Sequence, residues 1–382
     1  MLTQIGGLNA VPNEGYYKRD PGANKVDFLT ARGYLSFAIV KNIITAQFGH
    51  DKNFIGHGYR SLVLSDFSSN YLFLKINTKV WKLNYQNLYA QMTAQVLPGD
   101  GYYPKKYFAL HHLSLNITKN FNIGLFEAIV FGRSDSTVTT GTFDFNYLNP
   151  IIFFRSVEQQ LGSPDNANLG MDFRWNFAKR FSIYGQLFID ELRVGEIRAQ
   201  RGWWGNKQAW QIGFKYFDVF SLRNLDLQLE ANFARPYTYT HNSPFRAYTN
   251  YNQPLAHPLG ANFYELIAIV RYQPTGRLNL VCKAIVAQQG RDDAAANTNW
   301  GGNVFLDYRT FQQEYGNFIG QGVKTDILFL DFTASWQVRH NLFVDFKQTY
   351  RRLNSALPAL NQNTTFTALT VRWNIPQRVY AF

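Results

Sequence analysis

Long stretches of this sequence alternate strictly between apolar and polar residues, and this pattern limits the fold more than any other feature. In residues 170–177, 210–216 and 225–233 every second side chain is apolar. A period of two indicates a β-strand with one apolar and one polar face. Comparable segments, separated by short polar or Gly/Asn/Pro breaks, lie near residues 28–40, 71–82, 107–118, 121–131, 182–190, 263–272, 278–288, 324–338, 342–350 and 364–375.

These strands are too long for an ordinary soluble sheet. Strands in globular proteins usually have about 5–6 residues, whereas many of these run to ten or more, near the ~9–11 that a tilted membrane strand needs. Aromatic residues make up 17% of the 382-residue chain and charged residues also 17%, below the roughly 25% charged of soluble domains. No apolar run approaches the ~18 residues of a spanning helix. The prediction is an all-β fold, a transmembrane antiparallel β-barrel, with a soluble β-sandwich as the weaker alternative.

The chain is predicted to form one barrel, residues 28–382, after an N-terminal segment, residues 1–27, that is periplasmic or plug-like. The terminal residues 379–382, VYAF, resemble the last-strand signal of outer-membrane barrels. Residues 1–4 lack the features of a secretory signal, which favours a processed chain and leaves open whether a signal peptide was removed. The single Cys282 can form no internal disulfide and is interpreted as an inert wall residue. The bacterial outer membrane is the predicted location.

Charged residues inside the strands are predicted to face the interior, because a midplane Arg or Lys on the lipid face costs on the order of 2–4 kcal/mol. Both signs of charge there would form ion pairs that stiffen the wall and close the pore. The residues are Asp172, Arg174, Asp190, Lys215, Glu230, Glu265, Arg271, Lys347 and Arg372.

The net charge of +12 needs a separate account. No nucleic-acid partner is predicted, because the basic residues are scattered along the sequence and no binding motif accompanies them. Anionic lipopolysaccharide or an acidic surface polymer explains the charge better. A basic excess with no specific partner is an equal alternative.

The densest group of polar and glycine residues lies between residues 49 and 66, GHDKNFIGHGYRSLVLSD. Its glycines permit unusual backbone angles and close approach, which predicts a tight, folded-in loop between two strands. Arg60 and Asp66 are expected to fix the turn through charge-assisted hydrogen bonds. The structural residues of this motif are Gly49, Asp51, Gly56, Gly58, Arg60, Ser65 and Asp66.

Catalysis and metal binding are weak alternatives for the same stretch. His50, Asp51, His57 and Asp66 supply a base and an orienting group, but no serine or cysteine nucleophile stands in a recognisable motif. The two histidines also lack the i, i+4 spacing of a helical zinc site. Adjacent His111 and His112 point to opposite faces of a strand and cannot easily chelate one ion. No catalytic residue, no metal site and no cofactor is therefore predicted.

The motif in residues 49–66, followed by YLFLK at 71–75, resembles the signature of the Wzi-type capsule-assembly outer-membrane proteins. Similar later segments are GMD at 170–172, YGQ at 184–186 with IDE at 189–191, and the stretches PYTYTH at 236–241 and PLAHPLG at 254–260. The resemblance implies a barrel of about 18 strands whose lumen is occluded by inward loops. It implies a non-enzymatic role in attaching or assembling capsule or exopolysaccharide, with surface adhesion or gliding motility as a further role in some relatives. This chain departs from the family at FIGH, residues 54–57, where a W-W-G-P motif is common, and in its short N-terminal segment.

Two stretches have the flat and charged side chains that a polysaccharide site needs, because sugar rings present weakly polar C–H faces and hydroxyl groups. The alternative, equally weighted, is that these aromatic residues form the girdle at the membrane interface. The candidate ligand-binding residues are Arg201, Trp203, Trp204 and Lys207 in the first stretch and Tyr237, Tyr239 and His241 in the second.

The partners predicted from these features are outer-membrane lipid or lipopolysaccharide, a surface polysaccharide, and a larger outer-membrane protein complex of which the barrel would be one subunit. A porin or other channel is the main alternative function, and it would need an open lumen. An outer-membrane lipase or protease is a third class, but its nucleophile and base are not found. The sequence does not identify the sugar, the oligomeric state or whether the lumen conducts.

Overall fold

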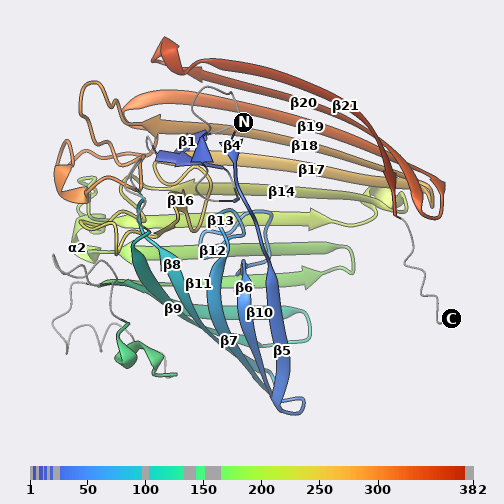
Figure 1. Cartoon of the computed structure of the whole chain (residues 1–382), viewed down its shortest axis with the longest axis horizontal. Coiled ribbons are helices and arrows are strands. Elements are labelled where there is room, and N and C mark those ends of the chain that lie inside the picture. The colour runs from blue at the N-terminus through green and yellow to red at the C-terminus, as the bar shows by residue number, and fades with distance from the viewer. Residues whose placement is uncertain are drawn as a thin grey trace.

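One large antiparallel sheet dominates the computed structural model, which describes residues 3–5, 8–11, 13–14, 18–19, 26–96, 103–132, 143–150 and 165–374 (Figure 1). Fifteen strands follow one another in the sheet, each paired with its neighbours in chain order. They are β5 (Gly33–Val40), β6 (Ile44–Asp51), β7 (Tyr71–Val80), β8 (Leu83–Thr93), β9 (Lys105–Asn116), β10 (Phe121–Phe131), β11 (Asn166–Phe177), β12 (Phe181–Glu191), β13 (Lys207–Tyr216), β14 (Leu225–Ala234), β17 (Phe263–Thr275), β18 (Leu278–Arg291), β19 (Val323–Arg339), β20 (Leu342–Ser355) and β21 (Gln362–Trp373).

The all-β prediction is confirmed, with fifteen strands in the described part of the sheet against the expected number of about eighteen. The outermost strands of the sheet are β5 and β21, and no pairing between them is present among the described residues. Short hairpins complete the β-structure: β1 (Thr3–Ile5) with β2 (Leu8–Ala10), β3 (Lys18–Arg19) with β4 (Val26–Asp27), and β15 (Thr249–Asn250) with β16 (Gln253–Pro254).

Among the described residues, helical structure is limited to single turns. They are η1 (Phe145–Leu148), α2 (Val194–Arg198), η2 (Val219–Ser221), η3 (Tyr308–Thr310) and η4 (Pro358–Leu360). Within the residues that the structure describes, none of these helices has the length and apolarity to cross a membrane.

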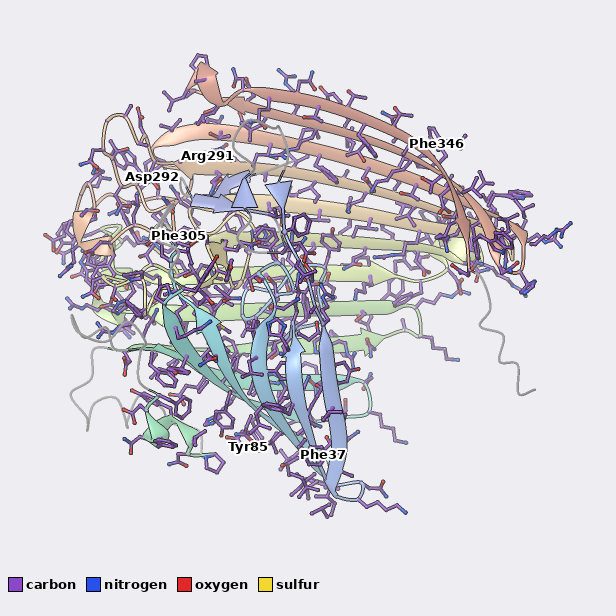
Figure 2. The ribbon with its side chains drawn as sticks, viewed as in Figure 1. Phe37, Tyr85, Arg291, Asp292, Phe305 and Phe346 are labelled. Carbon is purple, nitrogen blue, oxygen red and sulfur yellow. The ribbon has the colours of Figure 1, made fainter. Side chains whose placement is uncertain are left out.

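Because apolar and polar residues alternate along the strands, the two faces of the sheet differ in their side chains. In β17, Phe263, Glu265 and Ile267 are at most 3% exposed, whereas Tyr264 and Leu266 between them are 46% and 62% exposed. Phe346 on β20 and Tyr85 on β8 belong to the outer face and are labelled in Figure 2. An apolar outer face suits lipid and a polar inner face suits water and ion pairs.

The prediction that charged strand residues face inward is confirmed for all nine residues named above. Examples are Asp172, which contacts the inner His112, and Arg372, which pairs with the inner Asp345. Outside that set, Glu127, Asp326 and Arg352 lie on the outer face by register. Cys282 is also exposed on this outer face, in agreement with its interpretation as a wall residue.

The two ends of the sheet differ in the length of their connections. Seven short turns, of two to eight residues, join β5 to β6, β7 to β8, β9 to β10, β11 to β12, β13 to β14, β17 to β18 and β19 to β20. They gather toward the right and the bottom of Figure 1, whereas the long connections gather on the left. In outer-membrane barrels short turns face the periplasm and long loops face the outside. The longer loops of this chain therefore define its external end.

Residues 143–150, between β10 and β11, pack on the outer face of the sheet. Tyr147 is fully buried against Tyr89, Ala109 and Ile129, all of which project from that face. Tyr85 donates a hydrogen bond to the carbonyl of Pro150. Residues 143–150 therefore cover part of the wall from outside.

Only part of the predicted N-terminal segment, residues 1–27, is described. The Asn13 carbonyl accepts a hydrogen bond from Lys52, and the Glu14 carbonyl accepts one from Ser69. Both contacts join the segment to the loop between β6 and β7. The boundary at residue 27 stays a prediction, and the terminal signal at residues 379–382 lies outside the described residues.

Candidate functional site

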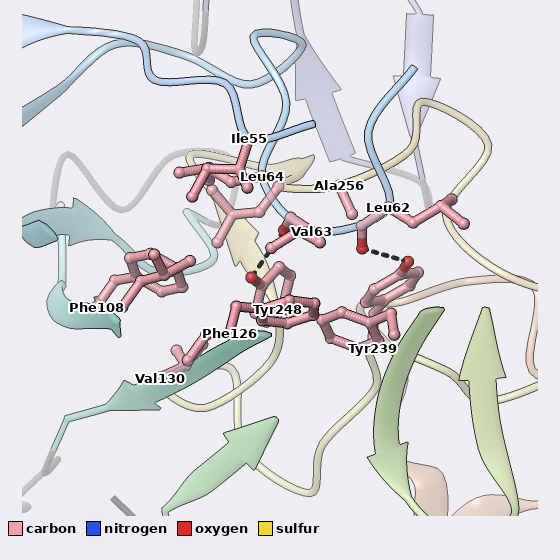
Figure 3. Close-up of a cluster of buried hydrophobic side chains, with 14 of the residues drawn as sticks. Ile55, Leu62, Val63, Leu64, Phe108, Phe126, Val130, Tyr239, Tyr248 and Ala256 are labelled. Carbon is pink, nitrogen blue, oxygen red and sulfur yellow. Dashed lines mark hydrogen bonds between the residues drawn. The ribbon is translucent and has the colours of Figure 1, made fainter. Parts of the chain in front are cut away.

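The loop between β6 and β7, residues 52–70, turns into the interior of the curled sheet and forms the centre of its main apolar cluster. Its residues Leu62, Val63 and Leu64 are fully buried. The Tyr239 hydroxyl donates to the carbonyl of Leu62, and the Tyr248 hydroxyl donates to the carbonyl of Val63, both at 2.8 Å (Figure 3). The sequence-based prediction of a folded-in loop is confirmed. We call residues 52–70 the inward loop.

Polar side chains of the wall hold the inward loop by its backbone. Glu230 on β14 accepts hydrogen bonds from the amides of Tyr59 and Arg60, at 2.6 and 3.0 Å. Gln186 on β12 accepts from the Leu62 amide and donates to the Ile55 carbonyl, at 2.8 and 2.9 Å. Because buried backbone groups need partners, these side chains fix the position of an irregular segment inside the sheet.

Arg60 makes the strongest link between the inward loop and the wall. Its guanidinium lies 3.0 Å from Glu265 on β17, a residue whose side chain is 1% exposed. Glu265 also contacts the ring of His257 at 2.7 Å and accepts a hydrogen bond from Asn232. The carboxylate is therefore surrounded by donors, as a buried charge requires. The sequence predicts that Arg60 fixes its own turn, but the structure shows a partner 205 residues away.

The glycines of the motif serve close packing against these wall residues. Gly56 has a φ of +131°, and a Cβ there would collide with the Gln186 amide. A Cβ at Gly58 would lie 2.6 Å from a Glu230 carboxylate oxygen. Gly49 lies in β6 and not in the loop, opposite Tyr34. Two of the three glycines therefore permit the loop to reach its two anchoring side chains.

The remaining motif residues have local roles. Asp51 accepts a hydrogen bond from the Lys52 amide at 2.8 Å and lies 3.6 Å from Arg32. The Ser65 hydroxyl and amide both donate to the carbonyl of Leu255. Asp66 is exposed, and its carboxylate has no hydrogen bond to a described residue. The expectation that Asp66 fixes the turn through its side chain is therefore not met, because that side chain points to solvent.

The histidines of the interior form ion-pair contacts and no metal centre. His112 approaches Asp172 at 2.6 Å, and His57 of the inward loop approaches the same carboxylate at 3.7 Å. His111 lies on the opposite face of β9, as predicted. Among the described residues, no group of three His, Cys, Asp or Glu side chains could hold a metal ion. Asp172 instead ties the inward loop to β9 and β11.

At the external end, three loops bring aromatic and basic side chains together. Trp204 stacks on Tyr308 and Phe311, with ring centroids 5.3 and 4.9 Å apart. Lys207 lies over the ring of Tyr308 at 4.3 Å, and His241 meets that ring edge-on at 5.4 Å. We call Trp204, Tyr308 and Phe311, with the neighbouring Arg201, His241, Arg309 and Tyr315, the external aromatic cluster.

Burial divides the seven predicted ligand-binding residues. Tyr237, Tyr239, Lys207 and Trp203 are at most 6% exposed. Tyr237 packs edge-on against Trp204, and Lys207 lies 3.8 Å from Asp190. Buried side chains offer no face to a polymer, so these four act as support. Arg201, Trp204 and His241 keep at least partial exposure.

The sequence analysis missed the third loop of this cluster, which contributes Tyr308, Arg309, Phe311 and Tyr315. Arg201 lies over the Tyr315 ring at 4.5 Å and pairs with Glu196 at 2.7 Å. Arg309 is 64% exposed and pairs with Asp307. The available signal was the sequence YRTFQQEY at 308–315, which mixes aromatic and charged residues as the other two stretches do.

The alternative, that these loop aromatics form a girdle at the membrane interface, is tested by comparing them with the aromatic residues on the strands of the barrel wall. Near the external end, Trp210, Phe233 and Tyr264 form a row on the outer face of β13, β14 and β17. Strand aromatics such as these occupy the positions at which girdle residues sit. The loop aromatics pack on one another, and Trp203 and Tyr237 are buried. This placement favours a loop cluster over a girdle.

We expect acid to loosen the loop that carries His241. Burial, together with Lys207 and Arg246, lowers the pKa of His241 to about 3 from 6.5. The unfolded chain takes up a proton below pH 6.5 while the folded loop does not, so stability is complete above that pH and declines as pH falls toward 3. Hydrogen exchange of residues 237–242, corrected for intrinsic rates, should be faster at about pH 4.5 than at about pH 7.5.

His241→Gln should remove this pH dependence, while a matched substitution of the exposed His340 at the opposite end should leave it intact. Equal pH dependence in wild type and His241→Gln would show that another group is responsible.

These features define a class of protein: an antiparallel membrane β-barrel with an apolar outer face and an interior filled by its own loop. The sequence matches the family described as capsule assembly protein Wzi over residues 2–368, so the chain belongs to that family and is a protein of the bacterial outer membrane. No curated protein matches the sequence.

A solved structure with the same fold is Wzi of Escherichia coli, described as an outer-membrane protein involved in group 1 capsule assembly and a carbohydrate-binding β-barrel. It has a TM-score of 0.60 and 13% identity, over 97% of this chain and 78% of that one. OprD of Pseudomonas aeruginosa is a more distant match, with a TM-score of 0.46 and 12% identity over 90% of this chain and 79% of that one. The channel DcaP of Acinetobacter baumannii has a TM-score of 0.37 and 9% identity, over 90% of this chain and 95% of that one.

Proposed function

We propose that this barrel holds a surface polysaccharide at its external aromatic cluster and takes part in capsule assembly without catalysing a reaction. Membership of the family supports a role in capsule assembly. The likeness to a barrel described as carbohydrate-binding supports a carbohydrate as the ligand. The observation that carries the proposal is the convergence of Trp204, His241 and Tyr308 from three separate loops at the external end.

The chemistry of the cluster suits a sugar chain. Half-buried rings such as Trp204 and Tyr308 present flat apolar surface to sugar C–H groups. The exposed guanidinium groups of Arg201 and Arg309 donate to hydroxyl or carboxylate oxygens. Both arginines are held by neighbouring carboxylates, which reduces the conformational entropy lost on binding. Contacts with lipopolysaccharide, a protein complex and a role in gliding remain predictions without a structural test.

A channel is the second candidate function, because a membrane β-barrel with a polar interior can form a water-filled pore. The inward loop opposes it, since its residues 55 and 62–64 occupy the interior as part of the main apolar cluster. The conductance experiment described in the Discussion separates the two functions.

Trp204→Ala is expected to weaken binding of capsular polysaccharide purified from the host strain by about tenfold or more, as for a central aromatic at a binding site. Isothermal titration calorimetry on the detergent-purified chain measures this change. Trp204→Phe keeps an aromatic face and should retain most of the affinity. Trp336→Ala, on the outer wall, is the matched control for losing an exposed tryptophan. Unchanged affinity in Trp204→Ala would place the sugar elsewhere.

A further inference from the structure

The basic residues that are scattered in the sequence come together at the end of the barrel with short turns. The seven short turns, each taken with one flanking residue on either side, contain eight lysines and arginines and a single acidic residue, Asp218. Their formal charge is therefore 8 − 1 = +7, of the +12 carried by the whole chain. The eight are Lys41, Lys82, Lys119, Lys179, Arg180, Arg223, Arg277 and Arg339, and we call them the basic rim.

The residues of the basic rim are distributed evenly over the turns, and neighbouring acids do not neutralise their charges within the part of the chain that the structure describes. Every one of the seven turns contributes at least one of these residues, and all except Arg180 are classed as exposed. None of the eight forms an ion pair with a described carboxylate. Near the external end, by contrast, Arg201, Arg309 and Lys324 each pair with a neighbouring acid. More than half of the formal net charge of the chain is concentrated at the end with the short turns.

Outer-face aromatics fix the depth of the basic rim in the bilayer. Trp175, Phe177, Phe181 and Tyr216 form a continuous row next to the turn that carries Lys179, with successive ring centroids 4.5 to 5.5 Å apart. Trp81 is 82% exposed, and Lys82 lies over its ring at 5.0 Å. Trp336 and Trp373 stand near the same end, 49% and 64% exposed. Tryptophan and tyrosine prefer the headgroup level, so the basic rim lies at the level of the lipid phosphates.

We propose that the basic rim binds the phosphate groups of anionic phospholipids in the periplasmic leaflet. Short turns face the periplasm, so the rim is at the opposite end from lipopolysaccharide and from the external aromatic cluster. Its charges are distributed one or two per turn along the whole sheet, as a shell of lipid requires, whereas a protein or polymer partner needs a local patch. Basic residues near an anionic membrane surface are attracted to its phosphate groups, and their contributions add. This inference is independent of polysaccharide binding.

Native mass spectrometry of the detergent-purified full chain tests the proposal with two lipids, phosphatidylglycerol and phosphatidylcholine, at equal concentration. The wild type should retain phosphatidylglycerol preferentially. The rim variant Lys41→Gln, Lys119→Gln, Lys179→Gln and Arg277→Gln should lose about tenfold or more of that preference. These four side chains have no hydrogen bond or ion pair to a described residue, and heat-dependent gel mobility verifies folding of the variant.

Two controls decide what causes the loss. A matched variant that removes four external charges, Arg32→Gln, Arg198→Gln, Arg309→Gln and Lys324→Gln, should keep the preference for phosphatidylglycerol. Replacing Lys41, Lys119 and Lys179 by arginine should also keep it. Equal loss in the external variant, or no preference in the wild type, overturns the proposal. The proposal is also overturned if the rim variant still selects phosphatidylglycerol but no longer binds alginate, a soluble acidic polysaccharide. The basic rim would then bind a polymer and not lipid.

Discussion

Arg60→Met is expected to destabilise the barrel by about 3 kcal/mol, because removing one partner of a buried ion pair leaves an uncompensated charge. The charge left behind is Glu265, whose side chain is 1% exposed and which would keep His257 and Asn232 as its partners among the described residues. Urea unfolding in detergent, followed by tryptophan fluorescence, measures the change in the free energy of unfolding.

A double-mutant cycle assigns this effect to the pair. Glu265→Gln should destabilise by a similar amount, and adding Arg60→Met to it should cost less than the sum of the two single changes. Arg309→Met, which breaks an exposed pair, should destabilise the barrel far less than either interior substitution. Additive effects of the two interior substitutions would show that the pair does not anchor the inward loop.

Shortening the inward loop is expected to convert a closed barrel into a conducting one. The Ile55 amide donates to the Leu64 carbonyl at 2.9 Å, so these two residues already stand opposite each other. Replacing residues 56–63 by a Gly-Gly turn should therefore close the loop with little strain. Because Leu62 and Val63 leave the interior with this change, single-channel recordings in a planar bilayer should change from little or no current to steady steps.

The control for this deletion is the removal of the exposed residues 294–296 from an external loop, which should leave conductance unchanged. A wild-type chain that already shows large steady currents would contradict the occluded interior and favour the channel function. A shortened chain that folds and yet does not conduct would show that another part of the chain blocks the interior.

Much of the fold follows from the sequence because each strand residue meets one of only two environments. Met171 and Phe173 meet the lipid side, whereas Asp172 and Arg174 meet the interior, and this choice depends on each side chain alone. The same local logic predicts that charged strand residues face inward, which the structure confirms for the nine residues predicted, although Glu127, Asp326 and Arg352 lie on the outer face. The glycines at 56 and 58 similarly indicate a loop that approaches other groups closely, without identifying those groups.

The candidate site is only partly predictable from the sequence. Trp204 is recognised as a candidate, but its stacking partners Tyr308 and Phe311 lie about a hundred residues later in a loop that offered no stronger signal than others. Tyr237 and Tyr239 have the composition of a surface site and prove to be buried. Burial of a loop residue depends on which other loops pack over it, and composition does not contain that information.

The sequence by itself determined the strands, the direction of their side chains and the inward course of residues 52–70. It did so because alternation, charge and glycine content act over a few neighbouring residues. Only the tertiary structure decided that Arg60 pairs with Glu265, that three distant loops build the external aromatic cluster, and that eight separate basic residues form one rim. These relations depend on strand register and on the curl of the sheet, which bring together side chains that are far apart along the chain.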